Sequence, residues 1–204
     1  MHQIKLSINP GNWHYFMRRK ADPAFRRIRD KIFERDQYAC QFCGFQAREY
    51  QEVINLDEDY RHNTMSNMVT SCCFCTQCFF IESVGQGDFG GGRLIYLPEM
   101  TQIELNSFCH VIFCAMTNGT SYRDSAQSVY RDLKFRSQPV EDKFGASSSN
   151  PNIFSQMILE HESNQKELAQ KLLVDLRLLP SYAKFKKQLT RWAASAAEEL
   201  ASAG

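Results

Sequence analysis

The first third of the chain shows one alternating pattern and one helical pattern. Apolar and polar residues alternate over residues 4–8 (IKLSI), which predicts a short strand, and residues 9–12 (NPGN) are typical of a turn. Asp22 followed by Pro23 predicts a helix start, because aspartate is a good N-cap and proline suits the first helical position. Apolar residues then recur at helical spacing, so we expect an amphipathic helix to about Asp36.

The second half of the chain is predicted to be mainly helical. Thr101 and Glu104 have the spacing of a capping box, and they open a strongly apolar helix that reaches about Met116. This helix is expected to lie in the core. Apolar spacing predicts three further helices, over residues 121–136, 151–179 and 181–203.

Short strands are predicted between these helices. Residues 52–56 (EVINL) and 67–71 (NMVTS) flank a polar loop, and residues 94–100 (LIYLPEM) form a strand that a proline stops. The glycine-rich segment 83–93 is the best candidate boundary. The expected fold is therefore α+β and mainly helical, with a small unit at residues 1–84 and a helical region at residues 85–204 that can pack with it as one domain.

Two groups of cysteines indicate a metal site. Cys40 and Cys43 form one CxxC pair, and after twenty-eight residues Cys72 and Cys75 form another. Two such pairs can bring four thiolates around one ion, and zinc accepts four sulfur ligands in a tetrahedron. We choose these four residues because the strand at 67–71 leads directly into a turn at Cys72. An iron–sulfur centre, a disulfide framework, a redox CxxC and ordinary buried cysteines are the alternatives.

Three other cysteines and one histidine are interpreted as apolar or structural residues. Cys75 and Cys78 also form a CxxC pair, but Cys78 is expected to be a small apolar residue of a helix over residues 76–84. Cys109 and Cys114 belong to the apolar set of the helix that ends near Met116. His110 is alone on that helix, and we expect its ring to be a hydrogen-bonded structural histidine.

Composition and charge narrow the classes of function. The 204 residues carry 24 Lys and Arg against 23 Asp and Glu, so no overall field attracts nucleic acid or an anionic membrane. The basic helix at residues 22–36 could contact phosphates, although a solvated face or a protein partner is favoured. Eight cysteines indicate a reducing compartment. The sequence shows neither a signal-peptide core nor an apolar stretch of about 20 residues, so a cytoplasmic location is expected.

The segment around the cysteines resembles the zinc-stabilised branch of the HNH nuclease fold. The resemblance rests on residues 33–44 (FERDQYACQFCG) and on residues 52–75, where strand, loop and cysteines align together. It implies a ββα unit on a four-cysteine zinc. The histidine positions of the nucleases are held here by Ile54, Asn55 and Thr76. The amide oxygen of Asn55 is too weak a base near neutral pH, and His62, the nearby imidazole, lies seven residues after the position of the base. The chain is therefore expected not to be an enzyme.

Nearly the whole chain resembles the IcmJ/DotN family of the type IVB (Dot/Icm) secretion apparatus. The resemblance rests on residues 11–20 (GNWHYFMRRK), on residues 90–116 and on residues 129–145 (VYRDLKFRSQPVEDKFG). It implies a zinc-binding adaptor of the coupling complex that binds the C-terminal part of the coupling ATPase and helps to recruit effector proteins. Such a subunit would reach the inner membrane through its partner. A nucleic-acid-binding protein and a residual HNH nuclease are the alternatives.

Overall fold

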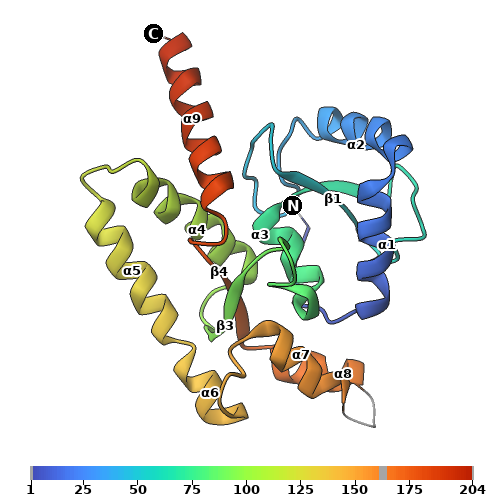
Figure 1. Ribbon diagram of the computed structural model, residues 1–204, viewed down its shortest axis with the longest axis vertical. Helices are drawn as coiled ribbons and strands as arrows, with labels where there is room; N and C mark the ends of the chain where they lie inside the picture. Colours follow the sequence, from blue (N-terminus) through green and yellow to red (C-terminus); the bar gives the residue numbers. More distant parts are fainter. Residues whose placement is uncertain (1, 161–164, 204) are drawn as a thin grey trace.

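The computed structural model describes residues 2–160 and 165–203, and it confirms an α+β fold that is mainly helical. Two small antiparallel sheets, β1–β2 and β3–β4, lie among the helices (Figure 1). The elements in chain order are α1 Pro10–Ala21, α2 Pro23–Arg35, β1 Gln51–Asn55, β2 Met68–Cys72, α3 Cys73–Thr76, η1 Gln77–Phe79, η2 Ile81–Ser83, β3 Gly92–Tyr96, α4 Gln102–Thr117, α5 Arg123–Phe135, α6 Gln138–Phe144, α7 Pro151–Leu159, α8 Gln165–Leu173, β4 Leu176–Pro180 and α9 Lys186–Ala203.

The N-terminal segment differs from the expected strand and turn. Residues 4–8 belong to no described strand, and they are tied to residues 78–81 by the hydrogen bonds from Ser7 N to Cys78 O and from Ile81 N to Ser7 O. The expected turn at residues 9–12 is wrong, because Pro10 is the first residue of α1. Asn-Pro is a turn signal, but proline is equally suited to the first turn of a helix, where its missing N–H costs nothing.

The predicted helix after Asp22 is confirmed as α2. Asp22 Oδ1 accepts a hydrogen bond from Ala24 N at 2.8 Å, so the aspartate is the N-cap. The buried face of α2 packs on the β1–β2 sheet and forms a small apolar cluster of Phe25, Ile32, Phe33, Val53 and Met68. This helix therefore covers one face of the first sheet.

The segment after β2 is not the single helix expected over residues 76–84. It consists of α3 and the short 3₁₀ helices η1 and η2, which are separated at Phe80 by a non-helical backbone with φ of −144° and ψ of 53°. Phe80 is fully buried, so its docking in the core breaks the helical run. Glu82 in η2 is also buried, and this burial raises the pKa of its carboxyl to about 7.

The capping box at Thr101 and Glu104 is confirmed. Thr101 Oγ1 accepts from Glu104 N at 3.2 Å, and Glu104 Oε2 accepts from Thr101 N at 2.7 Å. The helix that it opens, α4, lies in the core as expected, and Cys109 is fully buried. Cys114 is a correction, because it is exposed rather than part of the apolar set.

The expected helix over residues 151–179 is replaced by α7, α8 and the strand β4, with residues 161–164 outside the described residues. Strand β4 pairs antiparallel with β3, and Leu94 lies opposite Leu178. The leucines of β4 fit a helical spacing, but pairing with a strand about eighty residues earlier determines their structure. The last helix is also shorter than expected, because α9 begins at Lys186.

The main core joins elements from the whole chain. It contains Phe16 of α1, Phe74 of α3, Phe113 of α4 and Leu178 of β4, all at most 1% exposed. Helix α9 packs in the core at its N-terminal end through Leu189, beside Phe185 of the preceding turn, and Figure 1 shows its C-terminal end extending away from the other elements.

Candidate metal centre

The first cysteine pair lies in a tight hairpin between α2 and β1. Ala39 and Gln46 form an isolated β-bridge, Cys40 N donates to Phe45 O at 2.9 Å, and Gly44 N donates to Cys40 O at 2.9 Å. Gly44 adopts a φ of +75°, a left-handed conformation that favours glycine and lets the hairpin close. The turn holds both sulfur-bearing residues of the pair at its tip.

The second pair lies where β2 passes into α3. Cys72 is the last residue of β2 and the N-cap of α3, and Cys75 follows within the single turn of that helix. The backbone of Gln41 donates to Thr70 O at 2.9 Å, so the hairpin of the first pair is fixed against β2. The strand-to-turn geometry expected at Cys72 is therefore present.

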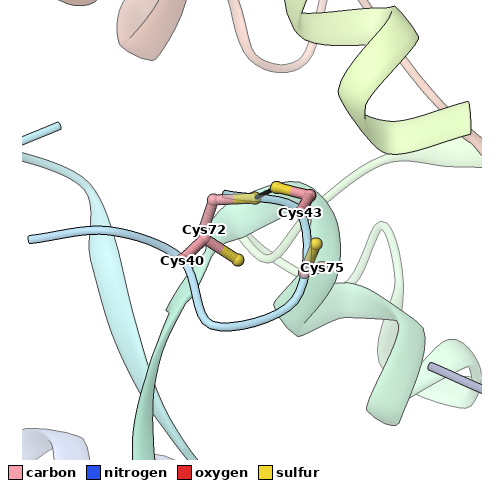
Figure 2. Close-up of side chains that lie close together, drawn as sticks. All are labelled: Cys40, Cys43, Cys72 and Cys75. Atoms are coloured by element: carbon pink, nitrogen blue, oxygen red, sulfur yellow. Dashed lines mark hydrogen bonds between the residues drawn. The ribbon is translucent and has the colours of Figure 1, made fainter. Parts of the chain in front are cut away.

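The four predicted cysteines come together in one cluster. The sulfur atoms of Cys40, Cys43, Cys72 and Cys75 all lie within 4.8 Å of one another, and Figure 2 shows them facing a common centre. Cys43 Sγ and Cys72 Sγ are 3.6 Å apart, far longer than the about 2.05 Å of a disulfide. All eight cysteines are free. Cys73 and Cys78 lie outside the cluster.

The cluster has the dimensions of a tetrahedral thiolate site. Zn–S bonds of about 2.3 Å in a tetrahedron separate the sulfurs by about 3.8 Å. The observed 3.6 Å between Cys43 and Cys72 is close to this value. Three of the four residues are buried and Cys43 is half-buried, so an ion at the centre would be almost enclosed by protein. The donor set and its spacing thus fit one zinc ion.

The charges of the cluster also favour a cation. Burial raises the pKa of the Cys72 and Cys75 thiols, so these groups resist ionisation by themselves. Burial also opposes ionisation of Cys40, but hydrogen bonds from the thiols of Cys43, Cys72 and Cys75 outweigh it and lower the pKa of Cys40. Four thiolates in this mostly buried cluster are therefore stable together only when a cation compensates their charge.

Helix α4 supplies two polar contacts to the sulfur atoms of the cluster that the sequence did not predict. Asn106 Nδ2 lies 3.3 Å from Cys75 Sγ, and His110 Nε2 lies 3.3 Å from Cys72 Sγ. Residues four apart share one helix face, so both side chains point at the four-cysteine cluster, which is called the cage below. The signal in the sequence was the four-residue spacing of Asn106 and His110 within a helix of largely apolar residues.

His110 is held between aromatic rings. Its ring stacks on Phe45, with centroids 3.7 Å apart, and on Phe74 at 4.3 Å. Burial lowers the pKa of His110 to about 3, so the imidazole is neutral and can donate one hydrogen bond, from Nε2 toward sulfur. The expectation of a hydrogen-bonded structural histidine is correct only for this nitrogen, because Nδ1 has no partner within the described residues.

A chain of buried hydrogen bonds connects the cage to β4. Gln102 Nε2 donates to Asn106 Oδ1 and to Leu178 O, both at 2.9 Å, and Leu178 N donates to Gln102 Oε1 at 2.8 Å. Asn106 in turn donates a hydrogen bond from Nδ2 to Cys75 Sγ. The second sheet, α4 and the cysteine cluster therefore form one bonded unit, and the orientation of the Asn106 amide is fixed by it.

Asn55 is the last residue of β1, and it pairs there with Met68 of β2. Its Oδ1 accepts from Arg19 Nη1, and its Nδ2 donates to Asp59 O at 2.9 Å and to His62 O at 2.8 Å. The side chain of Asn55 is fully buried and all its polar atoms are hydrogen-bonded. It is a structural centre for the loop between the two strands.

Arg19 is the unexpected partner of Asn55. It comes from α1, a helix that sequence reasoning missed, and it is 8% exposed. Its Nη2 donates to Val53 O at 2.6 Å and its Nη1 to Asn63 Oδ1 at 2.6 Å. Burial lowers the pKa of Arg19 to about 10, which still leaves the guanidinium charged at neutral pH.

His62 lies on the surface, away from the cysteine cluster. Its Nδ1 is 2.7 Å from Asp57 Oδ2, and Asn67 Nδ2 donates to Asp57 Oδ1 at 2.8 Å. Within residues 2–160 and 165–203, the four cysteines form the one group of three or more potential ligands that could hold a metal ion. Asp57 and His62 therefore do not complete a second site of this kind.

One curated protein is similar to this chain over nearly its full length. No family model matches it. The chain is 58% identical over 199 residues to the type 4 apparatus protein DotN of Legionella pneumophila subsp. pneumophila, and the alignment covers 98% of this chain and 93% of that protein. Across the described residues, no helix has both the length and the apolar composition that crossing a bilayer requires.

Proposed function

The chain belongs to the DotN (IcmJ) family, and from this premise we propose that it is a non-enzymatic subunit of a type IVB (Dot/Icm) secretion apparatus, built around one structural zinc ion. The relative is named as a type 4 apparatus protein. The observation that carries the proposal is the four-cysteine cluster at the junction of the hairpin, β2 and α4. An ion bound by this cluster would fix the hairpin and the end of β2 to each other.

We assign the metal ligands to Cys40, Cys43, Cys72 and Cys75. Zinc bound there would join the hairpin to the end of β2 and contribute folding free energy directly. A closed set of four protein ligands leaves no open coordination position for a substrate or water, which is typical of a structural zinc rather than a catalytic one.

The segment around the cage is proposed to be an HNH-like unit that has lost the nuclease activity of that fold. Asn55 stands where the resemblance implies the general base, and its hydrogen bond from Arg19 supports a structural role. An arginine held at that place is also unfavourable for a divalent cation, since both charges are positive. Ile54, at another of the histidine positions, is fully buried and offers no ligand atom.

A nuclease assay tests the absence of catalysis. Purified full-length chain, supplied with Mg²⁺ or Mn²⁺, is expected to leave plasmid DNA and RNA intact. Metal-dependent cutting that a single substitution at Asn55 or His62 abolishes would overturn this part of the proposal.

Binding of nucleic acid through α2 is the less favoured alternative. Arg29 and Arg35 of this helix pair with the neighbouring Asp30 and Asp36, at 2.9 Å and 2.8 Å. Arg35 also donates to Met68 O at 2.7 Å. These contacts reduce the positive charge that phosphates would meet. We expect no electrophoretic shift of DNA or RNA at low ionic strength, where such binding is strongest.

The proposed partner is the C-terminal part of the coupling ATPase, bound on the cytoplasmic side of the inner membrane. This assignment comes from the family resemblance. Co-expression of the full chain with the ATPase tail tests it, and we expect the two to elute together at a fixed ratio. Separate elution of a folded, zinc-loaded chain would refute the partner while leaving the metal assignment intact.

A further inference from the structure

A second cleft of the molecule lies apart from the cysteine cluster. It has a volume of about 820 Å³ and is bounded by the start of β3, by α5 and by the turn after β4. Its floor includes Met116, Tyr130 and Leu179. Tyr130 Oη donates to Pro180 O at 3.0 Å and accepts from Tyr182 N at 3.1 Å, so the floor is held in place.

The charged residues that line this cleft are all basic. They are Arg93 of β3, Arg131 and Lys134 of α5, and Lys184 after β4, and among the residues that the structure describes no aspartate or glutamate lines the cleft. Within the described part of the chain, none of the four forms an ion pair. Elsewhere on this nearly neutral chain, six other lysines and arginines do form ion pairs: Lys20, Arg29, Arg35, Arg61, Arg136 and Arg191.

Local contacts hold these cations around the cleft. Arg131 Nη2 donates to Ser128 Oγ at 3.1 Å, Arg93 Nη1 donates to Ser137 Oγ at 3.3 Å, and Lys134 Nζ lies 5.1 Å from the centre of the Tyr130 ring. The stem of Lys184 crosses Gly91 so closely that a Cβ at that glycine would be 2.6 Å from Lys184 Cγ. The close approach at Gly91 thus positions the fourth cation.

We propose that this cleft binds an acidic segment of a partner polypeptide, with carboxylates facing the four cations and an apolar side chain on the floor. A cleft lined by one sign of charge concentrates ligands of the opposite sign. Its size and apolar floor fit a peptide better than a free phosphate, which needs a close polar cage. The proposal is independent of the metal ion and of which protein supplies the segment.

Fluorescence anisotropy with a short labelled peptide, rich in glutamate and containing leucine, tests the proposal on the full-length chain. We expect binding that weakens as salt is added. The double variant Arg131→Gln/Lys134→Gln should bind at least about tenfold more weakly, as expected if each lost charge contributes about 0.7 kcal/mol. Lys184→Glu, on the opposite wall, should weaken binding independently, which keeps the test valid if one variant folds poorly.

Matched controls separate the cleft from general attraction between charges. Arg123→Gln/Lys143→Gln removes two exposed cations that do not line the cleft, and it should bind like the native chain. The same peptide with glutamine in place of glutamate should not bind. Equal loss of affinity in the control variant, native affinity in both cleft variants, or displacement of the peptide by an equal concentration of tripolyphosphate or of single-stranded DNA would each overturn the proposal.

Discussion

Removing the amide of Asn106 tests whether α4 stabilises the metal cage. Asn106 is fully buried, and its Nδ2 is 3.3 Å from Cys75 Sγ. Leucine has a similar size and shape but no N–H group, so Asn106→Leu removes the donor and retains the packing of the helix. The sulfur of a metal-bound cysteine is a charged, buried acceptor, and in the variant it has lost that donor.

The size of the effect follows from two estimates. A hydrogen bond to a charged group contributes about 1.5–3 kcal/mol. Loss of a hydrogen bond to a metal ligand typically weakens metal binding about 10- to 100-fold, which corresponds to about 1.4–2.8 kcal/mol. Gln102 Nε2 also loses an acceptor but keeps Leu178 O, which limits the further cost. We therefore expect a loss of about 2 kcal/mol in zinc binding.

The assay is the rate of zinc release from the full-length chain to an excess of a coloured chelator. Asn106→Leu should release zinc about 10- to 100-fold faster than the native chain. His110→Phe should also accelerate release, because phenylalanine can keep the stacking on Phe45 but cannot donate to Cys72. Cobalt-loaded protein gives a second readout, since its thiolate-to-metal absorption bands shift when a hydrogen bond to sulfur is lost.

The chain contains a matched control for this substitution. Asn118 Nδ2 lies 3.3 Å from Cys114 Sγ, an amide-to-sulfur contact at an exposed cysteine outside the cage. Asn118→Leu should therefore release zinc at the native rate. Native release by Asn106→Leu, or equal acceleration by both variants, would refute the role assigned to α4.

Three further predictions follow from the buried groups. Cys40→Ser should lose the zinc ion that Cys109→Ser retains, measured as metal per chain by mass spectrometry, and equal zinc contents would show the ligand assignment to be wrong. Arg19→Met should lower the free energy of unfolding in urea by about 3 kcal/mol, because Asn55 and neighbouring acceptors lose their donor; a loss below about 1 kcal/mol would contradict this. Because burial raises the pKa of Glu82 from 4.5 to about 7, the native chain should lose about 3 kcal/mol of stability as pH rises from 4.5 to 7 and little above it. Glu82→Gln should remove that dependence, and an unchanged pH profile in the variant would exclude Glu82 as its cause.

Local signals in the sequence predicted the parts of the fold that depend on neighbouring residues. Asp22 with Pro23, and Thr101 with Glu104, are caps whose partners lie within three positions, and both were found as expected. The CxxC pairs also act locally, since each places two sulfurs on one turn. For this reason the four clustered cysteines could be selected before their distances were known.

The missed features depend on contacts between distant residues. Strand β4 exists because Leu178 pairs with β3, and its leucines alone fit a helix equally well. Asn-Pro at α1 is compatible with a turn or with a helix start, and packing of Phe16 in the core favours the helix. The contacts of Asn106 and His110 with the cage likewise require the docking of α4. The boundary proposed between residues 84 and 85 stays a prediction.

X-ray absorption at the zinc edge tests the central claim most directly, because it reports the atoms bound to the metal in the native full-length chain. We predict one zinc per chain, surrounded by four sulfur atoms at about 2.3 Å. A first shell containing nitrogen or oxygen, or a chain purified from reducing conditions without stoichiometric metal, would contradict the four-cysteine cage on which this account rests.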